Sequence, residues 1–179
     1  MSQTAVAQIA QDPRLTQLAR SVLGTGAIPF RATLFDKTPA TNWLIPWHQD
    51  TALPLMARFD SPEWGPWSRK ARVHYAHAPA WALARVIALR LHLDDSCTDN
   101  GPLRVIPRSH TQGVLTDEQI AGRIQSPVEC LTPRCGVVAM QPLLIHSSSK
   151  LLTDAPRRVL QIEYADALEL AEGIRLAVV

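Results

Sequence analysis

The sequence predicts a mainly β protein, a sandwich or jelly roll with a few flanking α-helices. A helical pattern occurs near the N-terminus, whereas from about residue 29 onward the signals are mostly those of short strands. Fourteen prolines indicate many short segments joined by rigid turns. Many short strands after a helical start are typical of sandwiches and jelly rolls. We expect one domain over 1–179, with a helical segment at about 1–25, a β core at about 29–165 and a tail at about 166–179.

The first element is a helix within the N-terminal segment. Asp12 has a side chain suited to an N-cap, and Pro13 suits the first helical position. Apolar residues follow at helical spacing, and Gly24 is a typical C-terminal stop. The pattern therefore predicts a helix that begins after Asp12 and ends at Gly24.

The clearest strand runs from Val86 to Asp94, because apolar and other residues alternate along it. One predicted face consists of Ile87, Leu89, Leu91 and Leu93. The other consists of Ala88, Arg90, His92 and Asp94. In a jelly roll with an internal site, the second face can look into the cavity, so Arg90 and His92 are candidates to line it. The alternative is a cross-strand hydrogen-bonded pair that involves Asp94.

Shorter patterns predict the remaining elements. Asp99-Asn100-Gly101 is a strong turn signal. Thr116-Asp117-Glu118-Gln119 is typical of a capping box that opens a short helix. Further strands are predicted at Leu103–Ile106, Gly136–Met140, Leu143–His146 and Arg157–Tyr164. The segment Ala167–Leu176 is predicted to be a helix that packs on the outside.

Composition argues against several classes of protein. The chain has no run of 18 apolar residues, so no membrane span is expected. Its first residues lack the charged and apolar regions of a signal peptide. Three cysteines without a Cys-x-x-Cys pair favour reduced thiols in the cytoplasm over a structural zinc site. The net charge of +2, without a dense basic run, gives no reason to expect a nucleic-acid partner.

The first candidate for chemistry is His48-Gln49-Asp50, considered together with His146 and Arg157. A His and an Asp two residues apart on a strand point to the same side. A second His from a distant strand can complete a three-point face on a metal. Two His and one carboxylate form the facial triad of non-haem Fe(II) oxygenases, and a nearby Arg can hold the carboxylate of an oxo-acid.

Spacing alone does not select this segment. With 6 His and 10 Asp in 179 residues, random placement gives about a third of a His-x-Asp match per chain. The chain has two matches, His48-Gln49-Asp50 and His92-Leu93-Asp94. The residues by themselves leave the choice between them open.

Longer blocks of sequence resemble the phytanoyl-CoA dioxygenase family. The blocks are Leu34–Lys37, Pro46–Thr51, Leu89–Asp95, Asp99–His110, Pro142–Ser148 and Arg157–Leu160. They follow the order of the family and extend from about residue 29 to 165. The resemblance implies the double-stranded β-helix, a cupin-like jelly roll whose mouth holds iron.

The resemblance also implies the roles of individual residues. The metal ligands that it implies are His48, Asp50 and His146. It assigns Arg157, eleven residues past the distal His, to 2-oxoglutarate, and Ser148 to a contact with the same cosubstrate. Because neighbouring strand residues face opposite ways, Arg158 is expected outside when Arg157 is inside. Arg90, from the alternating strand, is predicted to join the cofactor-binding set.

The activity implied is that of an Fe(II)- and 2-oxoglutarate-dependent dioxygenase. Such an enzyme uses O₂ to hydroxylate a small organic substrate and releases succinate and CO₂. Asp50 favours hydroxylation, because related halogenases carry a small residue at that position. The alternatives are a non-catalytic metal-binding sensor or binding module, and a hydrolase or isomerase that holds a metal such as zinc on the same residues. Neither alternative needs Arg157.

Two features depart from the family pattern. Arg108 stands where the family usually has Gly before Ser109-His110. Since Gly adopts a positive φ that Arg disfavours, the sequence predicts a rearranged turn there. The chain is also short for the family, which leaves little room for extra helices and lid loops.

Overall fold

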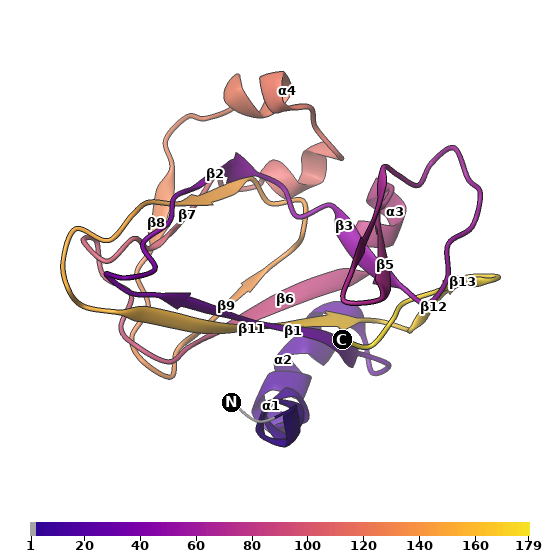
Figure 1. Cartoon of the computed structure of the whole chain (residues 1–179), viewed down its shortest axis with the longest axis horizontal. Helices are drawn as coiled ribbons and strands as arrows, with labels where there is room; N and C mark the ends of the chain where they lie inside the picture. The colour runs from indigo at the N-terminus through magenta and orange to yellow at the C-terminus, as the bar shows by residue number, and fades with distance from the viewer. Residues whose placement is uncertain (1–2) are drawn as a thin grey trace. The chain divides into compact units, whose positions relative to one another are not determined.

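The computed structural model describes residues 3–179 and is built mainly of strands (Figure 1). Its helices are α1 Gln3–Ala10, α2 Pro13–Leu23, α3 Ala80–Leu83 and α4 Asp117–Ala121, with a 3₁₀ helix at Ser109–Gln112. The first strands are β1 Ile28–Lys37, β2 Ile45–His48, β3 Ala52–Leu55, β4 Trp67–Lys70, β5 Val73–His77, β6 Val86–His92 and β7 Leu103–Val105. The later strands are β8 Val128–Cys130, β9 Val137–Met140, β10 His146–Ser148, β11 Arg157–Ala165, β12 Glu169–Ala171 and β13 Ile174–Arg175.

The chain divides into two compact units. The first comprises Met1–Ala32, Thr51–Leu89 and Ile162–Val179, and the second comprises Thr33–Asp50 and Arg90–Gln161. Strands β1, β6 and β11 contribute residues to both units. The expectation of a single domain over the whole chain stays a prediction.

The second unit contains the jelly-roll arrangement. Its strands belong to two four-stranded sheets, of order β1-β11-β6-β9 and β2-β10-β7-β8. Phe35 of β1 and Arg90 of β6 line the same cavity as His48 of β2 and His146 of β10, so the two sheets face each other there. The pairs β10–β2, β10–β7 and β7–β8 are antiparallel. This architecture confirms the predicted mainly β jelly roll.

The first unit holds the N-terminal helices and two small sheets, β3-β5-β4 and β12-β13. The predicted helix is confirmed at both ends. The Asp12 side chain accepts from the Arg14 N–H, and Gly24 closes α2 with a φ of 89°. The Tyr164 hydroxyl donates to the Ala10 carbonyl at 2.9 Å, which joins α1 to β11.

The C-terminal prediction is wrong. Residues Ala167–Leu176 do not form a helix but contain the hairpin β12–β13. Gly173 turns the chain with a φ of 74°, a conformation that glycine adopts without steric cost. The Leu176 N–H then donates to the Leu168 carbonyl at 2.8 Å. Pairing between the two arms therefore outweighs the helix propensity of the alanines and leucines.

A second prediction is displaced. The strand expected at Leu143–His146 begins at His146 and continues to Ser148. Pro142 lies in a turn that is closed by the Leu144 N–H on the Gln141 carbonyl, at 3.0 Å. The apolar run that predicts a strand forms a loop instead. The Leu143 side chain is buried in this loop, although its backbone does not pair with a strand.

Two local predictions have different outcomes. The capping box at Thr116 is confirmed, because the Thr116 side chain accepts from the Gln119 N–H and the Gln119 side chain accepts from the Thr116 N–H.

The turn at Arg108 is not rearranged. Arg108 itself adopts the left-handed conformation, with a φ of 65°. The surrounding structure therefore imposes a geometry that a β-carbon disfavours.

Strand β6 buries its second face as well as its apolar face. Arg90 is 4% exposed and His92 is 1% exposed, whereas Leu91 between them is only half-buried. The polar side chains at the end of this strand are thus buried, and of the two, Arg90 lines the cavity with His48 and His146, whereas His92 is not among its lining residues.

Two predictions that concern location are also addressed by the structure. No helix within residues 3–179 is both long enough and apolar enough to cross a membrane. The three cysteines, all in the described part of the chain, are free thiols: Cys97, Cys130 and Cys135.

Candidate metal centre

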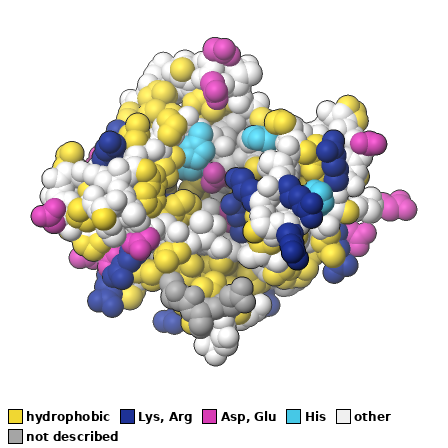
Figure 2. Space-filling model, viewed as in Figure 1, with side chains coloured by type: hydrophobic (Ala, Val, Ile, Leu, Met, Phe, Trp, Pro, Cys, Tyr) yellow, Lys and Arg dark blue, Asp and Glu magenta, His cyan; other side chains and the backbone are white. Residues whose placement is uncertain are grey.

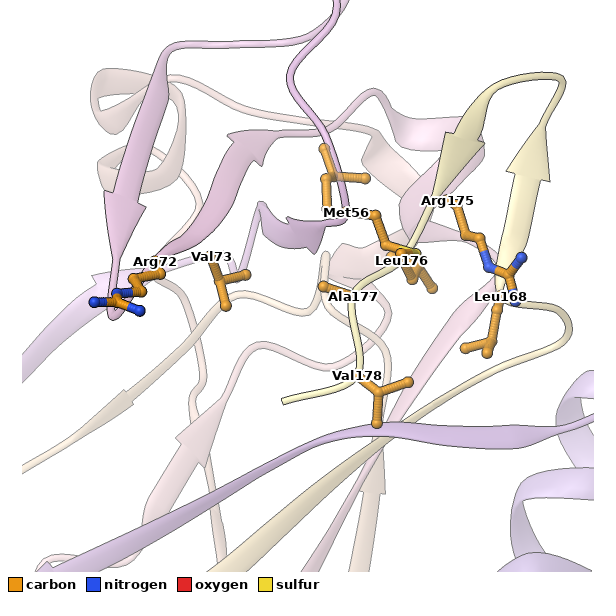
Figure 3. Close-up of a pocket in the computed structure, with 9 residues that line it drawn as sticks. Met56, Arg72, Val73, Leu168, Arg175, Leu176, Ala177 and Val178 are labelled. Atoms are coloured by element: carbon orange, nitrogen blue, oxygen red, sulfur yellow. The ribbon is translucent and has the colours of Figure 1, made fainter.

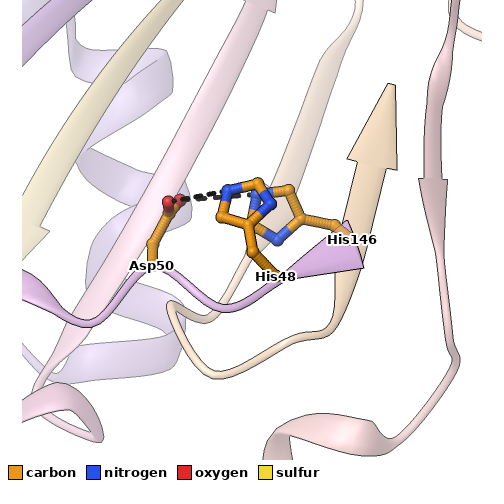
Figure 4. A group of neighbouring side chains, drawn as sticks. All are labelled: His48, Asp50 and His146. Carbon is orange, nitrogen blue, oxygen red and sulfur yellow. Dashed lines mark ion pairs between the residues drawn. The ribbon is translucent and has the colours of Figure 1, made fainter. Parts of the chain in front are cut away.

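Three side chains from distant parts of the sequence converge in the second unit (Figure 4). His48 ends β2 and pairs across the sheet with His146, which begins β10. The two imidazole rings lie 4.2 Å apart between centroids. Asp50 places one carboxylate oxygen 3.4 Å from His48 Nε2 and the other 3.6 Å from His146 Nε2. One ligand atom from each residue lies within 4.8 Å of the others, a spacing suited to one metal ion.

Gln49 fixes the segment that carries two of these residues. Its side-chain amide is buried and donates to the Gly113 carbonyl at 2.9 Å and the Leu143 carbonyl at 2.8 Å. Because Gln49 is held on the opposite side of the chain, His48 and Asp50 share the side that faces His146. The His-x-Asp spacing therefore produces the convergence that it predicts.

Hydrogen bonds orient both imidazoles. His48 Nδ1 lies 2.9 Å from the Pro46 carbonyl, and His146 Nδ1 lies 2.8 Å from the Leu144 carbonyl. A carbonyl only accepts, so each Nδ1 donates its proton there, and each Nε2 can offer a lone pair to a metal once it is itself unprotonated. Two lone pairs and a carboxylate then point at one position. Such a donor set fits a divalent cation.

Charge supports the same conclusion. Burial raises the pKa of the Asp50 carboxyl, but the His48 hydrogen bond and the nearby positive groups outweigh it and lower the pKa to about 2. Burial lowers the pKa of His146 to about 4, although Asp50 opposes this effect. Near neutral pH the cluster thus combines an anionic Asp50 with a neutral His146, whereas burial of His48 is outweighed by Asp50, which raises the pKa of that imidazole, so a metal would compete with a proton there.

The residues expected to bind the cosubstrate meet at Ser148. Arg157 Nη2 donates to the Ser148 Oγ at 3.0 Å, and Lys37 Nζ donates to the same oxygen at 2.8 Å. Ser148 in turn donates to the Gly101 carbonyl at 2.8 Å. Arg157 is 2% exposed and Lys37 is fully buried, whereas Arg158 is exposed. The predicted inward and outward directions of the two adjacent arginines agree with this burial.

Lys37 and Arg157 have no counter-ion among the described residues. Burial and, to a lesser extent, the Arg157 charge lower the pKa of Lys37 to about 8. Burial and the Arg90 charge lower the pKa of Arg157 to about 10. No carboxylate of residues 3–179 forms an ion pair with either group, and Arg157 Nη1 has no hydrogen-bond partner there. Buried cations are costly unless an anion neutralises them, so this arrangement fits a carboxylate ligand.

Lys37 was not recognised as a site residue from the sequence, although it belongs to the block Leu34–Lys37 that resembles the family. It ends β1 two residues after Phe35, which lines the cavity. Alternation along a strand places such residues on one face, and this signal indicates Lys37 as a pocket residue.

Arg90 and the second His-x-Asp segment lie beside this site. Arg90 lines a cavity of about 80 Å³ that also contains all three clustered side chains. Its guanidinium lies over the Phe35 ring at 5.0 Å and donates to the Gln161 side chain. Asp94 instead turns outward and forms a two-pronged pair with Arg158 at 2.7 and 2.8 Å. Asp94 therefore cannot act together with His92 as a pair of ligands.

A wider groove of about 370 Å³ lies in the first unit (Figure 3). Arg72 and Arg175 are among its lining residues, and Met56, Leu176 and Val178 are among its apolar ones. Basic side chains gather over the β4–β5 hairpin on the face shown in Figure 2. Among the described residues, the only group of side chains with the spacing of a metal site is His48, Asp50 and His146, and none of these three lines the groove.

The model of the phytanoyl-CoA dioxygenase (PhyH) family matches residues 1–159. The chain belongs to this family. The family model thus covers all three clustered residues together with Ser148 and Arg157.

Individual relatives share a low level of identity with this member of the phytanoyl-CoA dioxygenase family. L-proline trans-4-hydroxylase from Streptomyces griseoviridis is 26% identical over 88% of the chain. The chain spans 62% of the length of this curated relative.

Two solved structures share the fold. EctD from S. alaskensis in its apoform has a TM-score of 0.68 and 24% identity, over 93% of this chain and 55% of its own. The α-ketoglutarate-dependent epimerase SnoN from nogalamycin biosynthesis has a TM-score of 0.62 and 18% identity, over 92% of this chain and 57% of its own. These likenesses support the jelly-roll architecture.

Proposed function

We propose that this protein is an Fe(II)- and 2-oxoglutarate-dependent dioxygenase that hydroxylates a small organic molecule. The observation that carries the proposal is that a cluster suited to a metal and a pair of buried cations lie in the same compact unit. A His-Asp-His cluster suited to a divalent metal lies beside two buried cations, Lys37 and Arg157, that lack an anion. A dicarboxylate that binds the metal at one end and these cations at the other would account for both the metal cluster and the buried cations.

The protein's own residues would hold and orient the reactants. His48, Asp50 and His146 would bind the iron and leave positions open on its other side. Lys37, Arg157 and the Ser148 hydroxyl would hold the far carboxylate of 2-oxoglutarate.

Iron, 2-oxoglutarate and O₂ supply the oxidative chemistry when bound, with release of succinate and CO₂. The chain itself provides the placement of the reactants. A carboxylate at position 50 would itself take the ligand position that a halide would otherwise need, which supports hydroxylation as the outcome.

The comparisons support the same class. A curated relative is named as a trans-4-hydroxylase of L-proline, and EctD has been crystallised with 2-oxoglutarate and 5-hydroxyectoine. Both of these proteins are thereby associated with hydroxylated small molecules. A non-catalytic sensor or a zinc hydrolase would need the metal cluster but not Arg157 with Lys37.

The decisive experiment is anaerobic loading with Fe(II), followed by 2-oxoglutarate and air. Succinate formation is measured against a panel of small organic molecules, and product masses show whether oxygen is added. We expect succinate that depends on iron and an increase in product mass of one oxygen atom.

The variant Asp50→Gly removes the one anionic ligand of the cluster and should abolish both products. The surface variant Arg158→Ala, which loses an exposed ion pair, is the matched control and should retain activity. Undiminished turnover in Asp50→Gly would contradict the assignment of Asp50, and iron-independent succinate would contradict the proposed class.

A further inference from the structure

His92 is the residue of the second His-x-Asp segment that faces the interior. It is 1% exposed, and neither of its ring nitrogens has a hydrogen-bond partner among residues 3–179. Its backbone is fully paired, since its N–H donates to the Gly136 carbonyl at 3.0 Å and its carbonyl accepts from Cys135 at 2.8 Å. The polar atoms of His92 that lack partners are therefore those of its imidazole ring. Burial of a polar side chain without hydrogen-bond partners is costly.

The surroundings of His92 indicate what is missing. Arg90 precedes it on β6, and Arg157 lies on the adjacent strand β11. Burial, together with the charges of these two arginines, lowers the pKa of His92 to about 4. The imidazole is therefore neutral near pH 7 and has one N–H to donate, and the two arginine side chains whose charges act on it are also donors. Lys37 adds a third cation on the far side of Ser148.

Arg157, on the strand next to that of His92, shows the same deficiency. Its Nη1 is buried and has no partner among the described residues, while its Nη2 is engaged by Ser148. Two unsatisfied donors, one neutral and one cationic, are together suited to one carboxylate, whose two oxygens accept up to about four hydrogen bonds.

We infer that His92 donates its ring N–H to the distal carboxylate of 2-oxoglutarate, together with Arg157. This inference rests on the proposed function. It gives the cosubstrate site a neutral donor on β6 in addition to the cations of β1 and β11. Binding of the anion then satisfies the donors on His92 and Arg157 that the ligand-free protein leaves without partners.

The test compares His92→Leu, which removes the donor but fills the space, with His92→Gln, which keeps an N–H. The affinity for 2-oxoglutarate is measured by calorimetry on Fe(II)-loaded protein without oxygen. His92→Leu should weaken binding about tenfold or more, because a hydrogen bond to a charged group is lost. His92→Gln should recover much of that loss. The variant His110→Leu, at a histidine of the 3₁₀ helix, is the control and should bind like wild type.

A second readout separates a binding role from a structural one. If His92 serves the ligand, His92→Leu should unfold at the same urea concentration as the ligand-free wild type or at a higher one, because an unsatisfied polar group is removed. Equal 2-oxoglutarate affinity in His92→Leu and wild type would overturn the role of His92 and leave the proposed function standing. Loss of iron from His92→Leu would also overturn it. Absence of 2-oxoglutarate binding by the Fe(II)-loaded wild type would overturn both.

Discussion

At the scale of single residues, surroundings distinguish the two His-x-Asp segments. His48 meets Asp50 and His146, whereas His92 has Asp94 turned away toward Arg158. We expect His48→Ala to lose bound iron and His92→Ala to keep it, because only the first belongs to a three-ligand set. Metal analysis after anaerobic loading and desalting measures this difference. The opposite pattern would show that the second segment holds the metal.

The adjacent arginines offer a matched pair of substitutions. Arg157 is buried beside Ser148, and Arg158 is exposed and paired with Asp94. Removing one partner of a buried charge pair costs about 2–5 kcal/mol, or roughly 30- to 5,000-fold in affinity. Arg157→Ala should weaken 2-oxoglutarate binding within this range while iron binding survives, and Arg158→Ala should change little.

The lysine variant at the same position refines this prediction. Arg157→Lys should recover only part of the affinity, because a point charge does not replace a planar fork. Anaerobic titration of the Fe(II)-loaded variants with 2-oxoglutarate measures all three affinities. Damage from Arg158→Ala alone would mean that the strand places the other arginine in the site.

At the scale of elements, the turn before β7 limits what the chain tolerates. Gly101 has a φ of 69°, and a β-carbon added there would lie 2.3 Å from the Ser149 carbonyl oxygen. Gly113 has a φ of 74°, but an added β-carbon would meet nothing within 4 Å. Left-handed backbone costs a residue with a β-carbon about 1–2 kcal/mol, so Gly113→Ala should lose roughly that amount.

Gly101→Ala should lose more unfolding free energy than Gly113→Ala, because backbone must also move to relieve the contact. It should weaken 2-oxoglutarate binding as well, since the Gly101 carbonyl accepts from Ser148. Urea unfolding of both variants measures the difference in stability. Equal losses would indicate that the Ser149 segment shifts freely.

At the scale of the whole molecule, the uncompensated cations make stability depend on pH. Lys37 has a folded pKa of about 8, below its ordinary value of about 10.4. Between these values the unfolded chain binds more protons, so the unfolding free energy of the ligand-free protein should rise with pH. Below pH 8 the full cost of burying the charge is present, at most about 3 kcal/mol by this difference in pKa.

The comparison with Lys37→Met isolates this effect. Burial raises the pKa of Tyr164 to about 12, and this group opposes the rise at the alkaline end. The difference between wild type and Lys37→Met removes the Tyr164 contribution, because both proteins retain it. Urea unfolding from pH 7 to 10 should give a difference that shrinks as pH rises. A difference that is constant over this range would contradict a depressed Lys37 pKa.

The sequence by itself determined the features that depend on neighbouring residues. Asp12, Pro13 and Gly24 bounded a helix, and the alternation after Val86 predicted β6, because caps and strand periodicity act over a few positions. The blocks that resemble the family predicted the jelly roll and gave the residues of the candidate site, whose roles stay predictions.

Only the tertiary structure decided features that depend on distant partners. It made Ala167–Leu176 a hairpin, because pairing between two arms outweighs local propensity. It turned Asp94 outward and left His92 inside, although spacing made this segment equal to the first. It also brought Lys37 to Ser148, 111 positions along the chain. Burial and charge compensation act between residues that folding alone brings together, so no local pattern determines them.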